Sequence, residues 1–416
     1  MIMQNRKWIL VIILLILLAI NGCGIWLLGR KSVSAVATLT LKRLDQAIDL
    51  AAGYIVRNCD VNGRFTYLVN IKPGVKVKPN YNIIRHAGTI YALCMYEQSR
   101  PDEKTRQAIR RSVEYLKREA VTPIEGRPEM LAVWSKDKAL VSAKLGSAGL
   151  GLVALMSTEK VLPGTTPIEE LRKLGLFLLF MQKEDGSFYS KYILSSKEGR
   201  SSYPPSLYYP GEACLGLLML YEKDPQIEWL QGAANAISHL VRVRENTGKI
   251  ERDYWTLIAI AELLKYYDRC RQPISSTAIL QHAASICGYV VSDAQSNFGI
   301  YPGCFTGDRR TTPTSAALEG LLAALIYLPE EYKSLKQSIA STTEAGTAFL
   351  ITGQVMTGEY AGGFLAKAPD PKPKPNELGT RNSDTEIRID YVQHALSAML
   401  RYRKFFQEKL DKHENP

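Results

Sequence analysis

Side chains that could transfer protons or bind an anion are concentrated in two short segments of this 416-residue chain. They are Arg-His at 85–86 and Arg-Ile-Asp-Tyr-Val-Gln-His at 388–394. An imidazole is a general acid or base near neutral pH, a neighbouring carboxylate can raise its pKa, and guanidinium groups neutralise anionic substrates. Asp390 and His394 are four residues apart, so they would share one face of a helix. We expect a proton-transfer pair flanked by cations.

Three further segments could add carboxylates, aromatic rings and cations to such a site. They are Tyr-Tyr-Pro-Gly-Glu at 208–212, Asp-Tyr-Trp at 253–255 and Arg-Arg-Thr-Thr at 309–312. Structural interpretations compete with the functional ones. Asp253 would equally serve as a helix N-cap, and Glu212 as a first-turn acid favoured by the helix dipole. The aromatic residues suit either the core or a platform for a sugar ring.

These segments predict one composite site. The candidate catalytic residues are His86, Glu212, Asp253, Asp390, Tyr391 and His394, and the candidate substrate-binding residues are Arg85, Tyr209, Trp255, Arg310, Arg388 and Gln393. Neither metal-ligand spacing nor a phosphate-binding glycine loop occurs, so we expect no metal and no cofactor.

Two kinds of helical segment alternate from residue 42 onward, and they must position this site. The amphipathic, charged segments are 42–58, 103–119, 166–182, 224–243, 276–291 and 330–352. The segments that are apolar around most of their circumference are 82–98, 145–157, 209–222, 253–268, 313–327 and 384–402. A helix that is apolar all round must be buried. The alternation predicts an all-α fold, an (α/α)6 toroid with an inner ring wrapped by an outer ring.

The uneven spacing of the inner segments favours a closed ring over an open solenoid with a fixed repeat. In a closed ring the first and sixth inner helices are neighbours, so Arg85 and His86 should face the 388–394 segment. The loops that lead into the inner helices would then converge on one mouth.

Three outer segments end with a shared spacing: Phe177-Leu178, Gln182, Gly186 and Phe188; Phe349-Leu350, Gln354, Gly358 and Tyr360; and Tyr54-Ile55, Cys59, Gly63 and Phe65. This spacing resembles the QW repeat of terpene cyclases and related prenyltransferase-type toroids, where the repeats brace the outer helices. Six-hairpin glycosidases, polysaccharide lyases and uronyl epimerases have toroids of a similar kind. The Asp-x-Asp-Asp acid motif and the zinc ligands of the first group are missing, so we transfer no catalytic residue from any of these families.

The amino-terminal part contains an uncharged apolar run from Trp8 to Leu28, long enough to span a bilayer. We expect residues 1–31 to be a transmembrane signal anchor, or alternatively a lipoprotein signal in which Cys23 carries the lipid. Residues 32–405 would form a single toroid domain with no second domain, and residues 406–416 would form a polar tail. A short basic head before an apolar run is typical of export signals, so we expect the body to lie outside the cytoplasm.

Basic residues also gather in two loops that would rim the mouth: Lys72, Lys76 and Lys78 in one, and Lys372 and Lys374 in the other. The chain carries a formal net charge of +11, but its organisation does not suggest nucleic-acid binding. We expect an enzyme acting on an acidic envelope polysaccharide. It would be a glycoside hydrolase using two of the candidate carboxylates, or a lyase or epimerase using a histidine with Tyr391. The alternatives are a non-catalytic toroid that binds a glycan or an assembly partner, and a terpenoid-cyclase-like protein lacking the usual acid motif.

Overall fold

The computed structural model describes residues 39–137, 140–370 and 381–414. The predicted membrane segment Trp8–Leu28 lies outside these ranges, as do Lys372 and Lys374 of the second basic loop. Within them, no helix is both long and apolar enough to cross a membrane.

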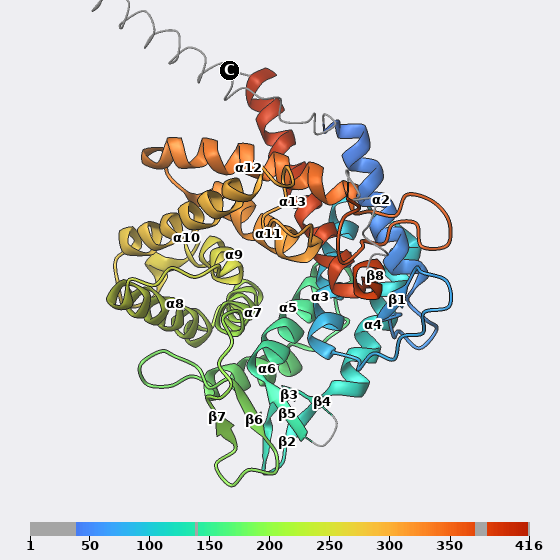
Figure 1. Ribbon diagram of the computed structural model, residues 1–416. Helices are drawn as coiled ribbons and strands as arrows, with labels where there is room; N and C mark the ends of the chain where they lie inside the picture. The colour runs from blue at the N-terminus through green and yellow to red at the C-terminus, as the bar shows by residue number, and fades with distance from the viewer. Residues whose placement is uncertain (1–38, 138–139, 371–380, 415–416) are drawn as a thin grey trace, which may run out of the picture. The chain divides into compact units, whose positions relative to one another are not determined.

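Twelve α-helices in the described part of the chain form two concentric sets (Figure 1). The outer helices are α2 (Leu41–Arg57), α4 (Glu103–Ala120), α6 (Ile168–Phe180), α8 (Ile227–Thr247), α10 (Ser276–Asn297) and α12 (Lys333–Thr352). The inner helices are α3 (Ile83–Ser99), α5 (Leu145–Val161), α7 (Tyr209–Lys223), α9 (Tyr254–Leu263), α11 (Thr311–Tyr327) and α13 (Ile389–Glu414). Short 3-10 turns are η1 (Tyr267–Arg269), η2 (Glu330–Tyr332) and η3 (Asn382–Thr385). Most bounds lie within a few residues of those predicted, but α13 continues past residue 405.

The two sets differ in burial as their sequences predict. On α4 the buried residues recur at helical spacing, as in Ile109, Val113 and Leu116, while the other face carries charges. On α5 every residue from Leu145 to Glu159 is buried, because this helix is covered on all sides. The hydrophobic core therefore lies between and within the two rings.

The inner helices close into a ring. Each packs against the next along the chain, and α13 packs against α3. Glycines let their backbones approach closely: a Cβ on Gly149 would lie 2.7 Å from the backbone of Ala213, and one on Gly88 would lie 2.4 Å from Nε2 of Gln393. The predicted (α/α)6 toroid, closed rather than open, is confirmed.

Most connections from an inner helix to the next outer helix are short, and most long loops lead from outer helices into inner ones; α9 is the exception, since its connection to α10 is longer than the one from α8. The starts of the inner helices therefore share one side, which we call the mouth. The long loops carry short strands that the sequence analysis did not predict: β1 (Leu68–Asn70), β2 (Val121–Ile124), β3 (Arg127–Val133), β4 (Ser135–Asp137), β5 (Leu140–Lys144), β6 (Lys191–Ile193), β7 (Arg200–Ser201) and β8 (Glu386–Arg388). The sequence analysis missed these strands because they are too short for a clear alternating pattern. The fold is therefore mostly helical, not purely α-helical as predicted.

All strand pairs in the described loops are antiparallel. β2 pairs with β3, and β4 to β7 form a four-stranded sheet in chain order. The pairing of β1 with β8 matters most for the mouth, because it aligns Leu68 with Arg388. It joins the loop before α3 to the loop before α13, so these distant segments meet at one place.

The predicted repeats brace neighbouring outer helices. The side-chain amide of Gln182 donates to the Gly232 carbonyl on α8 at 2.8 Å, and that of Gln354 to the Ala47 carbonyl on α2 at 2.9 Å. In the first repeat the Cys59 thiol lies 3.8 Å from the Ala108 carbonyl on α4. The structural role inferred for these positions is confirmed.

The glycines of these repeats have left-handed backbones packed against the next outer helix. They are Gly63 (φ 86°), Gly186 (φ 89°), Gly303 (φ 79°) and Gly362 (φ 93°). In the repeat that contains Gln354, two predicted positions were wrong. Gly362 and Phe364 take the places predicted for Gly358 and Tyr360, and Phe364 pairs with Gln354. Gly303 with Phe305 is a fourth occurrence that lacks the glutamine and was therefore missed.

Candidate functional site

Two arginines hold Asp390 at the mouth, Arg85 from α3 and Arg388 from the end of β8, just before α13. Arg388 Nη2 and Arg85 Nε each lie 3.0 Å from Asp390 Oδ2. Arg85 also donates to the hydroxyl of Tyr67, and the Arg388 guanidinium lies 4.5 Å from the centre of the Tyr391 ring. The Asp390 side chain is 7% exposed, while the two arginines remain 27% to 31% exposed. This cluster carries one surplus positive charge toward solvent, which suits an anionic ligand.

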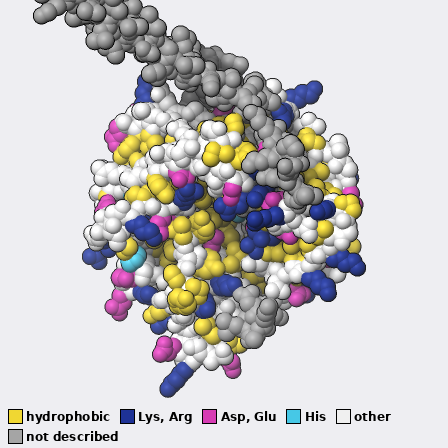
Figure 2. All heavy atoms as spheres, in the orientation of Figure 1, with side chains coloured by type: hydrophobic (Ala, Val, Ile, Leu, Met, Phe, Trp, Pro, Cys, Tyr) yellow, Lys and Arg dark blue, Asp and Glu magenta, His cyan; other side chains and the backbone are white. Residues whose placement is uncertain are grey.

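Lys and Arg side chains gather near the middle of the face seen in Figure 2, beside a recess with hydrophobic side chains. The β1–β8 pairing sets Arg388 at the entry to α13, next to the loop that leads into α3. The predicted meeting of Arg85 with the 388–394 segment is therefore confirmed.

His394 is paired with a carboxylate that the sequence analysis missed. Its Nδ1 lies 2.7 Å from Oε2 of Glu319 on α11, and the Ser397 hydroxyl donates to the other oxygen of Glu319. Burial favours the neutral imidazole, but the Glu319 carboxylate, with a smaller contribution from Asp390, raises the pKa of His394 above its ordinary value. Asp390 was expected to orient the His394 imidazole or to raise its pKa. It contributes to the raised pKa, but Glu319 orients the ring, because Asp390 is held by the arginines.

A neutral His394 that donates from Nδ1 to Glu319 keeps its lone pair on Nε2. Nε2 lies 3.5 Å from the amide nitrogen of Gln393, which is a long and weak hydrogen bond. The imidazole is thus oriented by a carboxylate and can accept a proton. The signal for Glu319 was present in the sequence, because it is the single acidic residue of the apolar helix α11.

His86 does not join this site. It is fully buried and makes two hydrogen bonds, from Nδ1 to the Tyr81 hydroxyl at 2.7 Å and from Nε2 to the Ser112 carbonyl on α4 at 2.8 Å. Burial lowers its pKa to about 4. The expectation that His86 pairs with His394 was wrong, because its ring points toward the outer layer while the adjacent Arg85 reaches α13.

Asp253 has the structural role that was weighed against the catalytic one. It is the N-cap of α9, accepting from the Thr256 backbone N–H at 3.0 Å, and its other oxygen accepts from Arg244 Nη2 at 2.5 Å. Arg244 also contacts Nε2 of the buried His282 at 3.1 Å. Both carboxylate oxygens of Asp253 are therefore occupied inside the protein.

Glu212 lies at the start of α7 and is almost fully buried. Its Oε2 has no hydrogen-bond partner among the described residues. Burial, with a contribution from Asp253, raises the pKa of Glu212 well above its ordinary value. A Cβ on Gly146 would lie 2.4 Å from this oxygen, so the glycine makes room for the carboxyl group.

The remaining candidates are spread around the ring. Trp255 on α9 lies 6.4 Å, ring centre to ring centre, from Tyr91 on α3. Gln393 is buried between α13 and α3, accepting from Thr89 at 2.9 Å. Arg310 is exposed and paired with Asp308 at 2.6 Å. Tyr209 lines a pocket of about 250 Å³ between α7 and α8.

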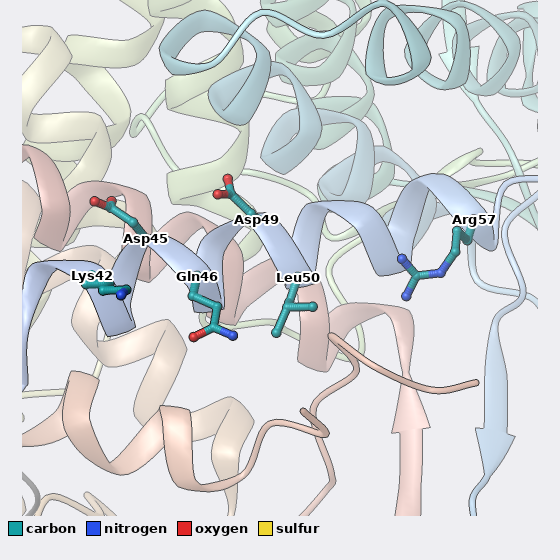
Figure 3. Close-up of a pocket in the computed structure, with 6 residues that line it drawn as sticks. All are labelled: Lys42, Asp45, Gln46, Asp49, Leu50 and Arg57. Atoms are coloured by element: carbon teal, nitrogen blue, oxygen red, sulfur yellow. The ribbon is translucent and has the colours of Figure 1, made fainter. Parts of the chain in front are cut away.

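A wider groove of about 730 Å³ runs along the outside of α2 (Figure 3). Asp45 and Asp49 point to one side of this helix, and Gln46 and Leu50 to the other. Both aspartates pair with Arg100, at 2.5 Å for Asp49. These ion pairs account for the charges of the two aspartates, so we assign the groove no chemistry.

No family model matches the chain, and no curated protein matches it. Solved structures do match. Cellobiose 2-epimerase from Spirochaeta thermophila aligns at 13% identity with a TM-score of 0.55, over 88% of this chain and 97% of that one. Unsaturated glucuronyl hydrolase from Streptococcus agalactiae aligns at 15% identity with a TM-score of 0.59, over 90% and 97%.

An α-1,6-mannanase from a Salegentibacter species aligns at 11% identity with a TM-score of 0.56, over 87% of this chain and 99% of that one. The chain has the fold of these enzymes. At such identities the likeness shows the fold alone. These structures do not support the resemblance to terpene cyclases that was drawn from the repeats. The repeats therefore indicate the ring architecture only.

Proposed function

We propose that this toroid is an enzyme that removes the proton next to the carboxylate of an acidic sugar, as a polysaccharide lyase or a uronyl epimerase does. The observation that carries the proposal is that His394, paired with Glu319 of α11, lies one turn along α13 from Asp390, which Arg85 and Arg388 hold. A base and a surplus of positive charge are thus brought together at the mouth.

The chemistry follows from the roles of these groups. Nε2 of His394 would take the proton, and Glu319 would hold the imidazole in the required tautomer and stabilise the imidazolium. Removing a proton beside a carboxylate places negative charge on the carboxylate oxygens. Arg85 and Arg388, already fixed by Asp390, would stabilise that charge without reorganising.

The hydrolase alternative is less well supported. A glycosidase of the usual kind uses two carboxyl groups flanking the bond. Of the three predicted carboxylates, Asp253 and Asp390 are held in ion pairs, which leaves Glu212 alone. That proteins of this fold include enzymes named for epimerisation and for glucuronyl hydrolysis supports a carbohydrate substrate in general terms.

The cellular setting is part of the proposal. The apolar run Trp8–Leu28 would tether the protein to a membrane, with the ring outside the cytoplasm. An acidic polysaccharide of the cell envelope would then be within reach of the mouth.

Incubation in D2O with oligosaccharides of mannuronate, galacturonate and glucuronate tests this function. NMR should show loss of the proton next to the carboxylate, as exchange, inversion or elimination. His394→Gln should slow this loss by roughly 100-fold or more. Binding without any proton loss would instead indicate a non-catalytic glycan-binding toroid, and hydrolysis without exchange would indicate a glycosidase.

A further inference from the structure

Glu212 and His394 project from opposite inner helices. In chain order α7 is the third inner helix and α13 is the sixth, and successive inner helices are neighbours in the closed ring (Figure 1). The third and sixth members of a six-membered ring are diametrically opposed. Side chains from another opposed pair, Tyr91 of α3 and Trp255 of α9, come within 6.4 Å between ring centres, so side chains can meet across this ring.

The contacts of α7 show that Glu212 points inward. Cys214 faces the outer ring, because its thiol lies 3.8 Å from the Ala233 carbonyl on α8. Two residues along an α-helix correspond to a rotation of roughly 200°, so Glu212 points away from the outer ring. A Cβ on Gly146 would lie only 2.4 Å from Oε2 of Glu212, so the carboxyl group lies beside the start of α5.

The Glu212 carboxyl group is buried, and its Oε2 has no hydrogen-bond partner among the described residues. An unpaired polar atom in a buried position costs free energy, which a bound partner would recover. Asp253 shows the contrast, since both of its oxygens are satisfied. A substrate bound in the ring would supply the missing partner of Glu212.

We infer that Glu212 is the catalytic acid that returns a proton to the sugar from the face opposite His394, so that the enzyme is a uronyl epimerase. This inference rests on the proposed function. Burial raises the pKa of Glu212, which favours the protonated form that a proton donor requires.

The step balances without a co-reactant. The C–H bond next to the carboxylate breaks, its proton goes to Nε2 of His394, and the electron pair moves into the carboxylate as an enediolate held by Arg85 and Arg388. The O–H bond of Glu212 then breaks, and a new C–H bond forms on the opposite face. The product is the epimer, and proton exchange with water resets both groups.

The position and stereochemistry of deuterium test this inference in D2O with the same oligouronates. The wild-type protein should place deuterium in the inverted product. Glu212→Gln, which keeps size and shape, should slow inversion by roughly 100-fold or more while His394 still exchanges the proton with retained configuration. Glu222→Gln is the matched control, because Glu222 is on the same helix but exposed and paired with Lys160; it should change nothing.

Each outcome has a distinct meaning. Inversion by Glu212→Gln at the wild-type rate, or exchange in the wild type with retention only, would overturn the role of Glu212 and leave the proposed function intact. Elimination that depends on His394 but gives no epimer would also overturn the role of Glu212, and it would identify the enzyme as a lyase. A wild-type protein that exchanges no proton would overturn both. Thermal unfolding of Glu212→Gln should match the wild type, which excludes misfolding as the cause.

Discussion

Glu319 and His394 form a hydrogen-bonded pair across two inner helices, with 2.7 Å between Oε2 and Nδ1. The two residues are 75 positions apart in the chain, and the packing of α11 against α13 brings them together. Glu319 thus orients His394 as a base, and two arginines paired with Asp390 lie nearby. The proposed proton transfer depends on this arrangement.

The pair predicts a pH dependence. Because Glu319 raises the pKa of His394, Glu319→Gln should lower that pKa, which NMR titration of the ring protons can follow. Turnover should fall, since the imidazole becomes a weaker base. In the wild type the rate should increase as pH rises through the pKa of His394, where the neutral base forms. An unchanged His394 pKa in Glu319→Gln would contradict this account.

The arginine cluster predicts charge-dependent binding. Arg388→Ala and Arg85→Ala should each raise KM for an oligouronate by roughly 10-fold or more, because each removes a cation from the mouth. The difference in KM between these variants and the wild type should become smaller at high salt, which screens exposed charges. Arg118→Ala is a suitable control, since Arg118 lies on the outer helix α4 and is exposed. Equal effects of the three substitutions would argue against a specific anion site.

Two buried histidines predict sensitivity to acid. Burial lowers the pKa of His86 and, with Arg244, that of His282 to about 4. Each group is neutral when folded but binds a proton near pH 6.5 when unfolded. The free energy of unfolding should therefore be highest above pH 6.5. It should decrease by roughly 3 kcal/mol per histidine as the pH falls from 6.5 toward 4.

Urea unfolding at several pH values measures this loss. The pH dependence of the wild type should be steeper than that of His86→Gln, in which one of the two groups is absent. Equal slopes for the two proteins between pH 6.5 and 4 would show that His86 does not contribute.

The left-handed glycines predict a matched pair of substitutions. Gly358 and Gly362 both have positive φ, but a Cβ on Gly362 would lie 1.8 Å from the Leu50 carbonyl oxygen, whereas one on Gly358 would meet no atom within 4 Å. Gly358→Ala should cost about 1 to 2 kcal/mol from backbone strain alone. Gly362→Ala should cost clearly more, because it also forces the turn that follows α12 away from α2. Similar losses on denaturant unfolding would refute the bracing role of Gly362.

The sequence by itself determined the ring. Helical periodicity, and the contrast between amphipathic and wholly apolar segments, depend on local composition and on the general need to bury apolar surface, so both could be read without a structure. The meeting of Arg85 with Asp390 could also be predicted, since it follows from closing six inner helices into a circle.

The tertiary structure decided which side chains share the site. Arg85 and His86 are adjacent in sequence, but neighbours on a helix point about 100° apart, and only packing showed that one reaches α13 and the other α4. Arg244 settled the role of Asp253, and Glu319 replaced Asp390 as the partner of His394. A side chain's role depends on the partners it meets in space, and those partners come from distant parts of the chain.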